Sequence, residues 1–157
     1  MTKIAIFVDV QNIYYTTRQA FGRQFNYRQF WQQILQQGDI VIANAYAIAR
    51  DDDQQHKFQT ALKHIGFDVK LKPFIQRSDG SAKGDWDVGI AIDVLDAGPD
   101  VDKIILLSGD GDFDLLLAKV ADKFQCETHV FGVAQLTAAS LINAADNFTR
   151  IDSGLLM

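Results

Sequence analysis

Short apolar runs alternate along the chain with longer segments in which apolar residues recur at helical spacing. The runs are rich in β-branched residues and are bounded by polar residues or glycine, which predicts buried strands. Five strands are expected, at Lys3–Asp9, Ile40–Ala49, Phe67–Lys72, Lys103–Ser108 and Thr128–Phe131. Strands that are apolar on both faces are typical of a parallel sheet covered by helices.

The segments between these strands carry helical patterns. Four helices are expected at Asn12–Ala20, Tyr27–Gln37, Asp51–Ile65 and Trp86–Ala97. A fifth is expected after the fourth strand, where an apolar stripe consists of Phe113, Leu116, Leu117, Val120 and Phe124. The alternation predicts an α/β fold, a three-layer α/β/α sandwich with a mainly parallel central sheet. The 157 residues are 48% apolar and contain no linker-like segment, so a single domain over residues 1–157 is expected.

Aspartates follow two of the predicted strands. The first strand ends at Asp9, and Asp110 and Asp112 come directly after the fourth. The carboxyl ends of parallel strands meet at one edge of a sheet, where ligands of open α/β sheets bind. Carboxylates that lie close together repel one another, and they either take up protons or hold a cation. We therefore interpret this edge as a metal site.

The helix expected at Trp86–Ala97 adds a fourth carboxylate. At about 100° per residue, Asp87 falls within the apolar arc of this helix and should face inward. The alternative is that Asp87 is a capping residue in the first turn of a helix, and that Gly109–Asp112 is a turn with capping aspartates. Asp93 flanks the same arc and is either a supporting residue of the site or solvated.

Composition and known motifs narrow the function. The first residues enter a strand without the pattern of a secretion signal and no long apolar run follows, so a cytoplasmic protein that does not span a membrane is expected. The single Cys126 excludes an internal disulfide, and we expect it in a strand as a core residue. The chain lacks the glycine-rich motifs of P-loop nucleotidases and dinucleotide-binding proteins.

Three sequence blocks resemble one family. Phe7-Val8-Asp9-Val10-Gln11-Asn12 resembles the D-x-x-N that closes the first strand of NYN domains, a branch of the PIN-like nucleases. Lys83-Gly84-Asp85-Trp86-Asp87-Val88, followed by Asp93, resembles a segment of the LabA-like group in that branch. Ser108-Gly109-Asp110-Gly111-Asp112-Phe113 resembles the S-G-D-x-D-F that follows the fourth strand. The blocks appear in family order and span most of the chain.

The middle block departs from the family pattern by one residue. The family usually has one residue between Lys-Gly and the aspartate, whereas this chain has two, Asp85 and Trp86. Asp87 is the better match, because Val88 and the spacing to Asp93 then fit. Asp85 is expected to be a loop residue near the site.

The resemblance implies a ribonuclease that depends on Mg²⁺ or Mn²⁺. It implies that Asp9, Asp87 and Asp110 ligate the metal, directly or through water, and that Asp112 completes the acidic cluster or orients the attacking water. Asn12 would position a phosphate oxygen or a water molecule, and Ser108 would hydrogen-bond a carboxylate or the phosphate. Lys83 would bind phosphate at the rim of the site.

The net charge of −5 limits how strongly such a protein would hold RNA, so modest affinity for RNA is expected. The alternative is a non-catalytic metal-binding regulatory module that binds RNA or protein. Aromatic residues interleave with Arg18, Arg23 and Arg28 in the segment from Tyr14 to Tyr27. We interpret that segment as core aromatics with a solvated basic face. Oligomeric state is left open by the sequence.

Overall fold

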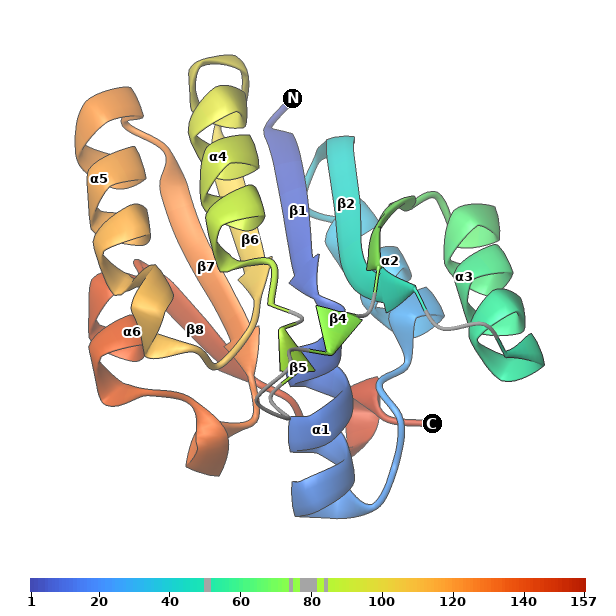
Figure 1. The fold of residues 1–157 in the computed structure, drawn as a ribbon. Coiled ribbons are helices and arrows are strands. Elements are labelled where there is room, and N and C mark those ends of the chain that lie inside the picture. Colours follow the sequence, from blue (N-terminus) through green and yellow to red (C-terminus); the bar gives the residue numbers. More distant parts are fainter. Residues whose placement is uncertain (50–51, 74, 77–81, 84) are drawn as a thin grey trace.

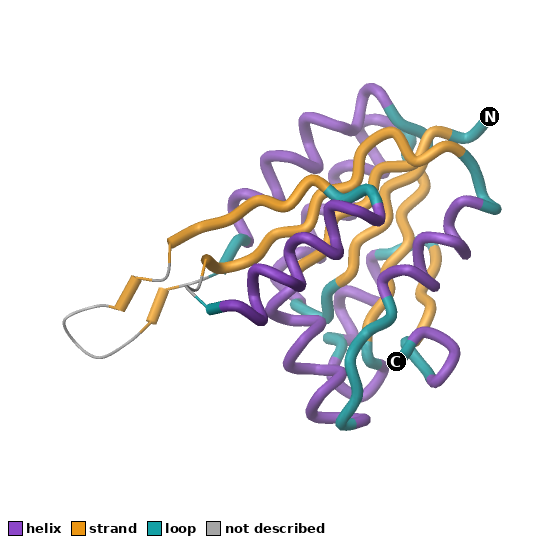
Figure 2. Tube along the Cα trace, turned by 90° about the vertical axis from the view of Figure 1, so that its right-hand side faces the viewer, coloured by secondary structure: helices purple, strands orange, loops and turns teal. Residues whose placement is uncertain are grey.

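A computed structural model describes residues 1–49, 52–73, 75–76, 82–83 and 85–157. Six parallel strands form its central sheet, in the order β3-β2-β1-β6-β7-β8. The strands are β1 (Lys3–Asp9), β2 (Asp39–Ala49), β3 (Asp68–Pro73), β6 (Lys103–Leu107), β7 (Glu127–Gly132) and β8 (Asn147–Arg150). The two-residue strands β4 (Ile75–Gln76) and β5 (Ala82–Lys83) pair as an antiparallel ribbon that reaches beyond the sheet (Figure 2).

Helices cover both faces of the sheet, as Figure 1 shows. The helices α1 (Val10–Phe21), α2 (Tyr27–Leu35) and α3 (Asp53–Ile65) pack on one face. The helices α4 (Asp87–Ala97), α5 (Asp114–Phe124) and α6 (Ala139–Ala144) pack on the other. The expected three-layer α/β/α sandwich is therefore confirmed.

The apolar periodicity explains both layers. Alternate residues of β1 enter different cores: Ile4, Ile6 and Val8 face α1 and α2, whereas Ala5 and Phe7 face α4 and α5. This is why the strand is apolar at nearly every position. On α5 the expected stripe faces the sheet, with Leu117 and Val120 fully buried.

The sequence analysis was wrong at several boundaries and missed short elements. Helix α1 begins at Val10 rather than Asn12, because the Asp9 side chain caps it. The expected helix start at Asp51 lies outside the described residues, and Asp52 caps α3. Cys126 is buried but precedes β7 instead of lying in a strand, and its thiol donates to the carbonyl of Gly98 at 3.2 Å. Helix α6 and strand β8 were missed because each has fewer than seven residues.

The aromatic residues between Tyr14 and Tyr27 differ in burial. Phe25 and Tyr27 are buried as expected, whereas Tyr14, Tyr15 and Phe21 are 44%, 48% and 37% exposed. The prediction of a core role is therefore wrong for the three aromatic residues of α1.

The close packing of Gly98 after α4 yields a stability prediction. A Cβ at this position would overlap the ring of Phe124, so we expect Gly98→Ala to lower the free energy of unfolding by about 1–3 kcal/mol. In a Phe124→Ala background the same change should cost less, because all the ring atoms that cause the overlap are absent. Urea denaturation of the four proteins measures this; equal costs in both backgrounds would contradict the packing explanation.

Candidate metal centre

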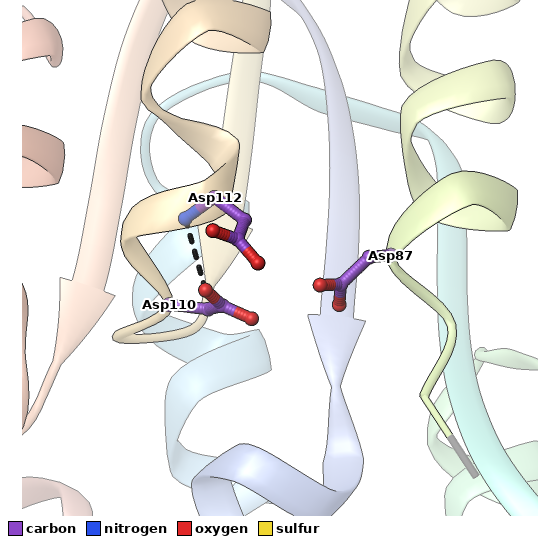
Figure 3. A group of neighbouring side chains, drawn as sticks. All are labelled: Asp87, Asp110 and Asp112. Atoms are coloured by element: carbon purple, nitrogen blue, oxygen red, sulfur yellow. Dashed lines mark hydrogen bonds between the residues drawn. The ribbon is translucent and has the colours of Figure 1, made fainter. Parts of the chain in front are cut away.

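Three carboxylates converge at the carboxyl edge of the sheet. Asp87 is the first residue of α4, and Asp110 and Asp112 lie in the turn between β6 and α5. One carboxylate oxygen of each residue lies within 4.8 Å of the others. Figure 3 shows the three side chains pointing toward one another. Residues more than twenty positions apart in the chain thus form one acidic cluster.

The turn after β6 is shaped by hydrogen bonds and by close packing. The backbone N–H of Asp112 donates to Oδ1 of Asp110 at 2.9 Å, which fixes the relative position of these two residues (Figure 3). A Cβ on Gly109 would lie 2.6 Å from the carbonyl oxygen of Leu136, and one on Gly111 would lie 2.9 Å from Cβ of Ala138. Glycine at both positions therefore lets the turn lie against residues 136–138.

Asp9 lies beside the cluster and ties β1 to β6. Its Oδ2 accepts a hydrogen bond from the Ser108 hydroxyl at 3.2 Å, and the same hydroxyl accepts from the backbone N–H of Asp110 at 3.1 Å. Its Oδ1 accepts from the backbone N–H of Asn12 at 3.4 Å. Asp9 is not among the three residues whose oxygens approach within 4.8 Å, but one hydroxyl connects it to the Asp110 backbone.

Asn12 and Ser108 hold the ends of the two strands together. The Asn12 side-chain oxygen accepts from the backbone N–H of Gly109 at 2.9 Å. Ser108 is fully buried, so its hydroxyl is committed to the Asp9 carboxylate and the Asp110 backbone. Of the two roles expected for Ser108, the geometry favours contact with a carboxylate over contact with a phosphate.

The remaining candidate residues are placed differently. Asp85 accepts from the backbone N–H of Asp87 at 3.3 Å, next to the cluster. Asp93 instead accepts from the Tyr46 hydroxyl at 2.7 Å and pairs with Lys70 at 3.1 Å, so these contacts bind it to β2 and β3. The backbone of Lys83 belongs to β5, and its side chain lies outside the described part of the structure.

Trp86 and Tyr46 position the start of α4. This role of the two aromatic residues was not predicted from the sequence. The Trp86 indole donates to the carbonyl of Ala47 in β2 at 2.9 Å, and its ring lies 5.3 Å from that of Tyr46. Lys72 lies over the indole at 4.6 Å. The extra residue in the K-G-D-W-D segment was the available signal, because the inserted tryptophan is the anchor that places Asp87.

Burial and mutual repulsion raise the pKa values of two carboxyl groups. Burial contributes most to raising the pKa of Asp87 to about 7, and the neighbouring Asp110, Asp85 and Asp9 add to it. Burial also raises the pKa of Asp9 to about 6, against the hydrogen bonds from Asn12 and Ser108, which lower it. Without a cation, this edge therefore retains protons near neutral pH.

The donor set fits a hard divalent cation. Three carboxylate oxygens converge, and Mg²⁺ and Mn²⁺ prefer oxygen ligands. Among the residues that the structure describes, the ion pairs are Lys70–Asp93 and Lys103–Glu127, and neither reaches the cluster. A bound cation would supply the positive charge that the described side chains do not.

Comparison with known proteins gives the family. Residues 3–152 match the NYN domain. The chain belongs to the NYN domain family. It is 31% identical to the low amplitude and bright protein LabA of Synechococcus elongatus, over 96% of this chain and 84% of that protein. The resemblance found in the three sequence blocks is therefore confirmed.

Two solved structures share the fold of this chain. A crystal structure of a protein of unknown function from Vibrio parahaemolyticus is 52% identical, with a TM-score of 0.95 over 99% of this chain and 96% of that chain. Ribokinase from Giardia lamblia is 11% identical, with a TM-score of 0.52 over 95% of this chain and 57% of that chain, and shares the fold alone. None of the helices that the structure describes is long and apolar enough to cross a membrane.

Because the pKa of Asp9 is raised, we expect Asp9→Asn to increase the stability of the metal-free protein in EDTA. Below pH 3.8 Asp9 is protonated in both folded and unfolded chains. Between pH 3.8 and about 6 the folded chain keeps a proton that the unfolded chain releases, so wild-type stability falls as the pH rises. The variant lacks this penalty and should be more stable at pH 8 by about 1–3 kcal/mol.

Denaturant titrations at pH 3.5 and pH 8 measure the effect. The difference between Asp9→Asn and wild type should vanish at the lower pH. Asp96→Asn, which changes an exposed aspartate of α4, is the charge-matched control. A variant less stable than wild type at pH 8 would show that the Asp9 carboxylate is held by net attraction.

Proposed function

We propose that this chain is a ribonuclease that uses Mg²⁺ or Mn²⁺ to hydrolyse RNA phosphodiester bonds. The observation that carries the proposal is the approach of the Asp87, Asp110 and Asp112 oxygens within 4.8 Å, at the sheet edge where α/β proteins bind ligands. Membership of the NYN domain family, a branch of the PIN-like nucleases, supports the reaction class.

Asp87, Asp110 and Asp112 would hold the cation, and Asp9 would contact it directly or through water. When bound, Mg²⁺ or Mn²⁺ lowers the pKa of a bound water and neutralises charge on the phosphate. Asp112, the exposed member of the cluster, would also orient the attacking water. Asp85 would keep the start of α4 in place through its contact with the Asp87 backbone.

Asn12 and Lys83 would contact the substrate. The Asn12 oxygen is occupied by Gly109, so its amide nitrogen is the group that can donate to a phosphate oxygen. Lys83 would bind phosphate, as the resemblance of its sequence block to the family implies, and it lies in the β4–β5 ribbon before α4. Ser108 would act as a positioning residue, since its hydroxyl orients the Asp9 carboxylate.

The second candidate is a metal-binding regulatory module without efficient turnover. Its support is the net charge of −5, which gives RNA less long-range attraction than a basic protein would. Both functions require the cation, and they differ in whether RNA is cleaved.

Replacement of single carboxylates tests turnover. Asp110→Asn keeps an oxygen that can cap the N–H of Asp112 but removes one charge, and Asp87→Asn removes a charge from α4. We expect each to lower Mn²⁺-dependent cleavage of a mixed set of single-stranded and structured RNAs about 100-fold or more. Asp96→Asn should cleave as wild type does. Cation binding without cleavage by wild type would favour the regulatory module.

Metal affinity should fall as the pH is lowered. Asp87 and Asp9 have pKa values of about 7 and 6, so below these values a proton competes with the cation. We expect Mn²⁺ affinity to fall about tenfold per pH unit for each displaced proton between pH 6 and pH 5. Calorimetry in buffers of different ionisation enthalpy should show proton release on binding. Affinity that is constant from pH 8 to pH 5 would contradict binding at this cluster.

A further inference from the structure

A cleft of about 550 Å³ opens between α1 and α3 on the face of the sheet opposite α4. Ligand sites of this size are typical for small molecules, and a nucleoside fits within them. The lining combines aliphatic side chains with side-chain amides, aromatic rings and one lysine. The polar and aromatic residues used below are Gln11, Gln24, Gln54, Gln55, Tyr14, Tyr27 and Lys57.

The cleft begins next to Asp9, the residue beside the acidic cluster. Val10 and Gln11, which line it, directly follow Asp9. Ala47, at the carboxyl end of β2, lines the cleft while its carbonyl accepts from Trp86, the residue before Asp87. A chain bound in the cleft could therefore continue to the cluster.

Tyr27 shows that the cleft can satisfy a polar ligand. Its side chain is 8% exposed and lines the cleft, and its hydroxyl makes no hydrogen bond to the residues that the structure describes. A ligand with a hydrogen-bonding edge that entered the cleft would meet this hydroxyl, which can donate or accept a hydrogen bond.

The amides and rings suit a nucleobase. Each of the four glutamines that line the cleft offers both donors and an acceptor, the groups that pair with base edges. Tyr14 is 44% exposed and can stack on a base. The neutral amides and rings of the lining suit an uncharged heterocycle.

Basic groups continue from the cleft on the side away from the cluster. A smaller hollow of about 170 Å³ shares Tyr14 and Gln24 with the cleft and adds Arg18 and Arg23. Lys57 lines the cleft itself. These cations can contact phosphates on the far side of a bound base.

We propose that this cleft binds the base of a nucleotide that neighbours the scissile phosphate of single-stranded RNA. The proposal rests on the proposed function, because that function puts the scissile phosphate at the acidic cluster. The scissile phosphate would then lie at the cluster, the neighbouring base in the cleft and the next phosphate at the basic hollow. The cleft thus selects unpaired RNA, because a base must leave its stack to enter it.

Binding is tested in EDTA, where cleavage is not required. The probes are the four nucleoside 5′-monophosphates, ribose 5-phosphate and a single-stranded RNA tetranucleotide, followed by calorimetry or chemical shift. We expect at least one mononucleotide to bind, ribose 5-phosphate to bind at least tenfold more weakly, and the tetranucleotide to bind more tightly than the mononucleotide. Equal binding of ribose 5-phosphate would overturn base recognition, and equal binding of mononucleotide and tetranucleotide would overturn the RNA-chain assignment.

Matched variants locate the binding. Tyr14→Ala should weaken nucleotide binding about tenfold, the effect of losing one base-stacking ring. Phe21→Ala is the control, since Phe21 is also exposed on α1 but does not line the cleft. Equal effects of the two variants would overturn the proposal.

Tyr27→Phe separates ligand binding from structure. The change removes only a hydroxyl that has no described protein partner, so the melting temperature should be unchanged or higher while nucleotide binding weakens several-fold. Weaker folding with unchanged binding would overturn the role of Tyr27. Failure of the ribonuclease proposal is distinguishable: wild type would then bind nucleotides in EDTA but not cleave RNA with Mn²⁺.

Discussion

The parallel pairing of β1 with β6 is the constraint on which the rest of the site depends. The register places Val8 opposite Leu107, so Asp9 and Ser108 emerge side by side at the edge of the sheet. Two side chains then secure the junction: Ser108 bonds the Asp9 carboxylate, and Asn12 bonds the Gly109 backbone. A slip of one residue would turn the aspartates to the other face of the sheet. The geometry of the acidic edge and the strand register are thus the same requirement.

The acidic edge is maintained against its own electrostatics. Burial and neighbouring charges raise the pKa values of Asp9 and Asp87, so ionisation opposes folding at this edge. The two apolar cores on either side of β1 supply the compensating stability, because most side chains of that strand are fully buried. A cation would relieve the repulsion only in the folded chain, which couples its binding to stability.

The three-layer fold and the convergence of aspartates at the sheet edge could be predicted from the sequence, but the contacts that orient those aspartates could not. Asp9, Asp110 and Asp112 could be predicted because strand ends in a parallel sheet share an edge, and Asp87 because of its place on the apolar arc of α4. Tyr46 could not, since its contact with Trp86 depends on how β2 pairs with β1 and where α4 packs. Asp93 flanks the apolar arc of α4, yet Lys70 and Tyr46 on neighbouring strands bind it. Local periodicity gives the direction of a side chain and does not give the partner that it meets.

A net charge of −5 is compatible with RNA binding when opposite charges occupy separate regions. The carboxylates gather at the start of α4 and in the turn before α5. The basic residues lie elsewhere: Arg18 on α1, Arg23 between α1 and α2, and Lys57 on α3. Over a Debye length of about 8 Å at physiological salt, a phosphate near one region is only weakly repelled by the other. A divalent cation at the cluster would cancel two of its negative charges and would offer a phosphate oxygen a direct electrostatic contact. Local arrangement, and not net charge, therefore decides whether this acidic chain can hold RNA.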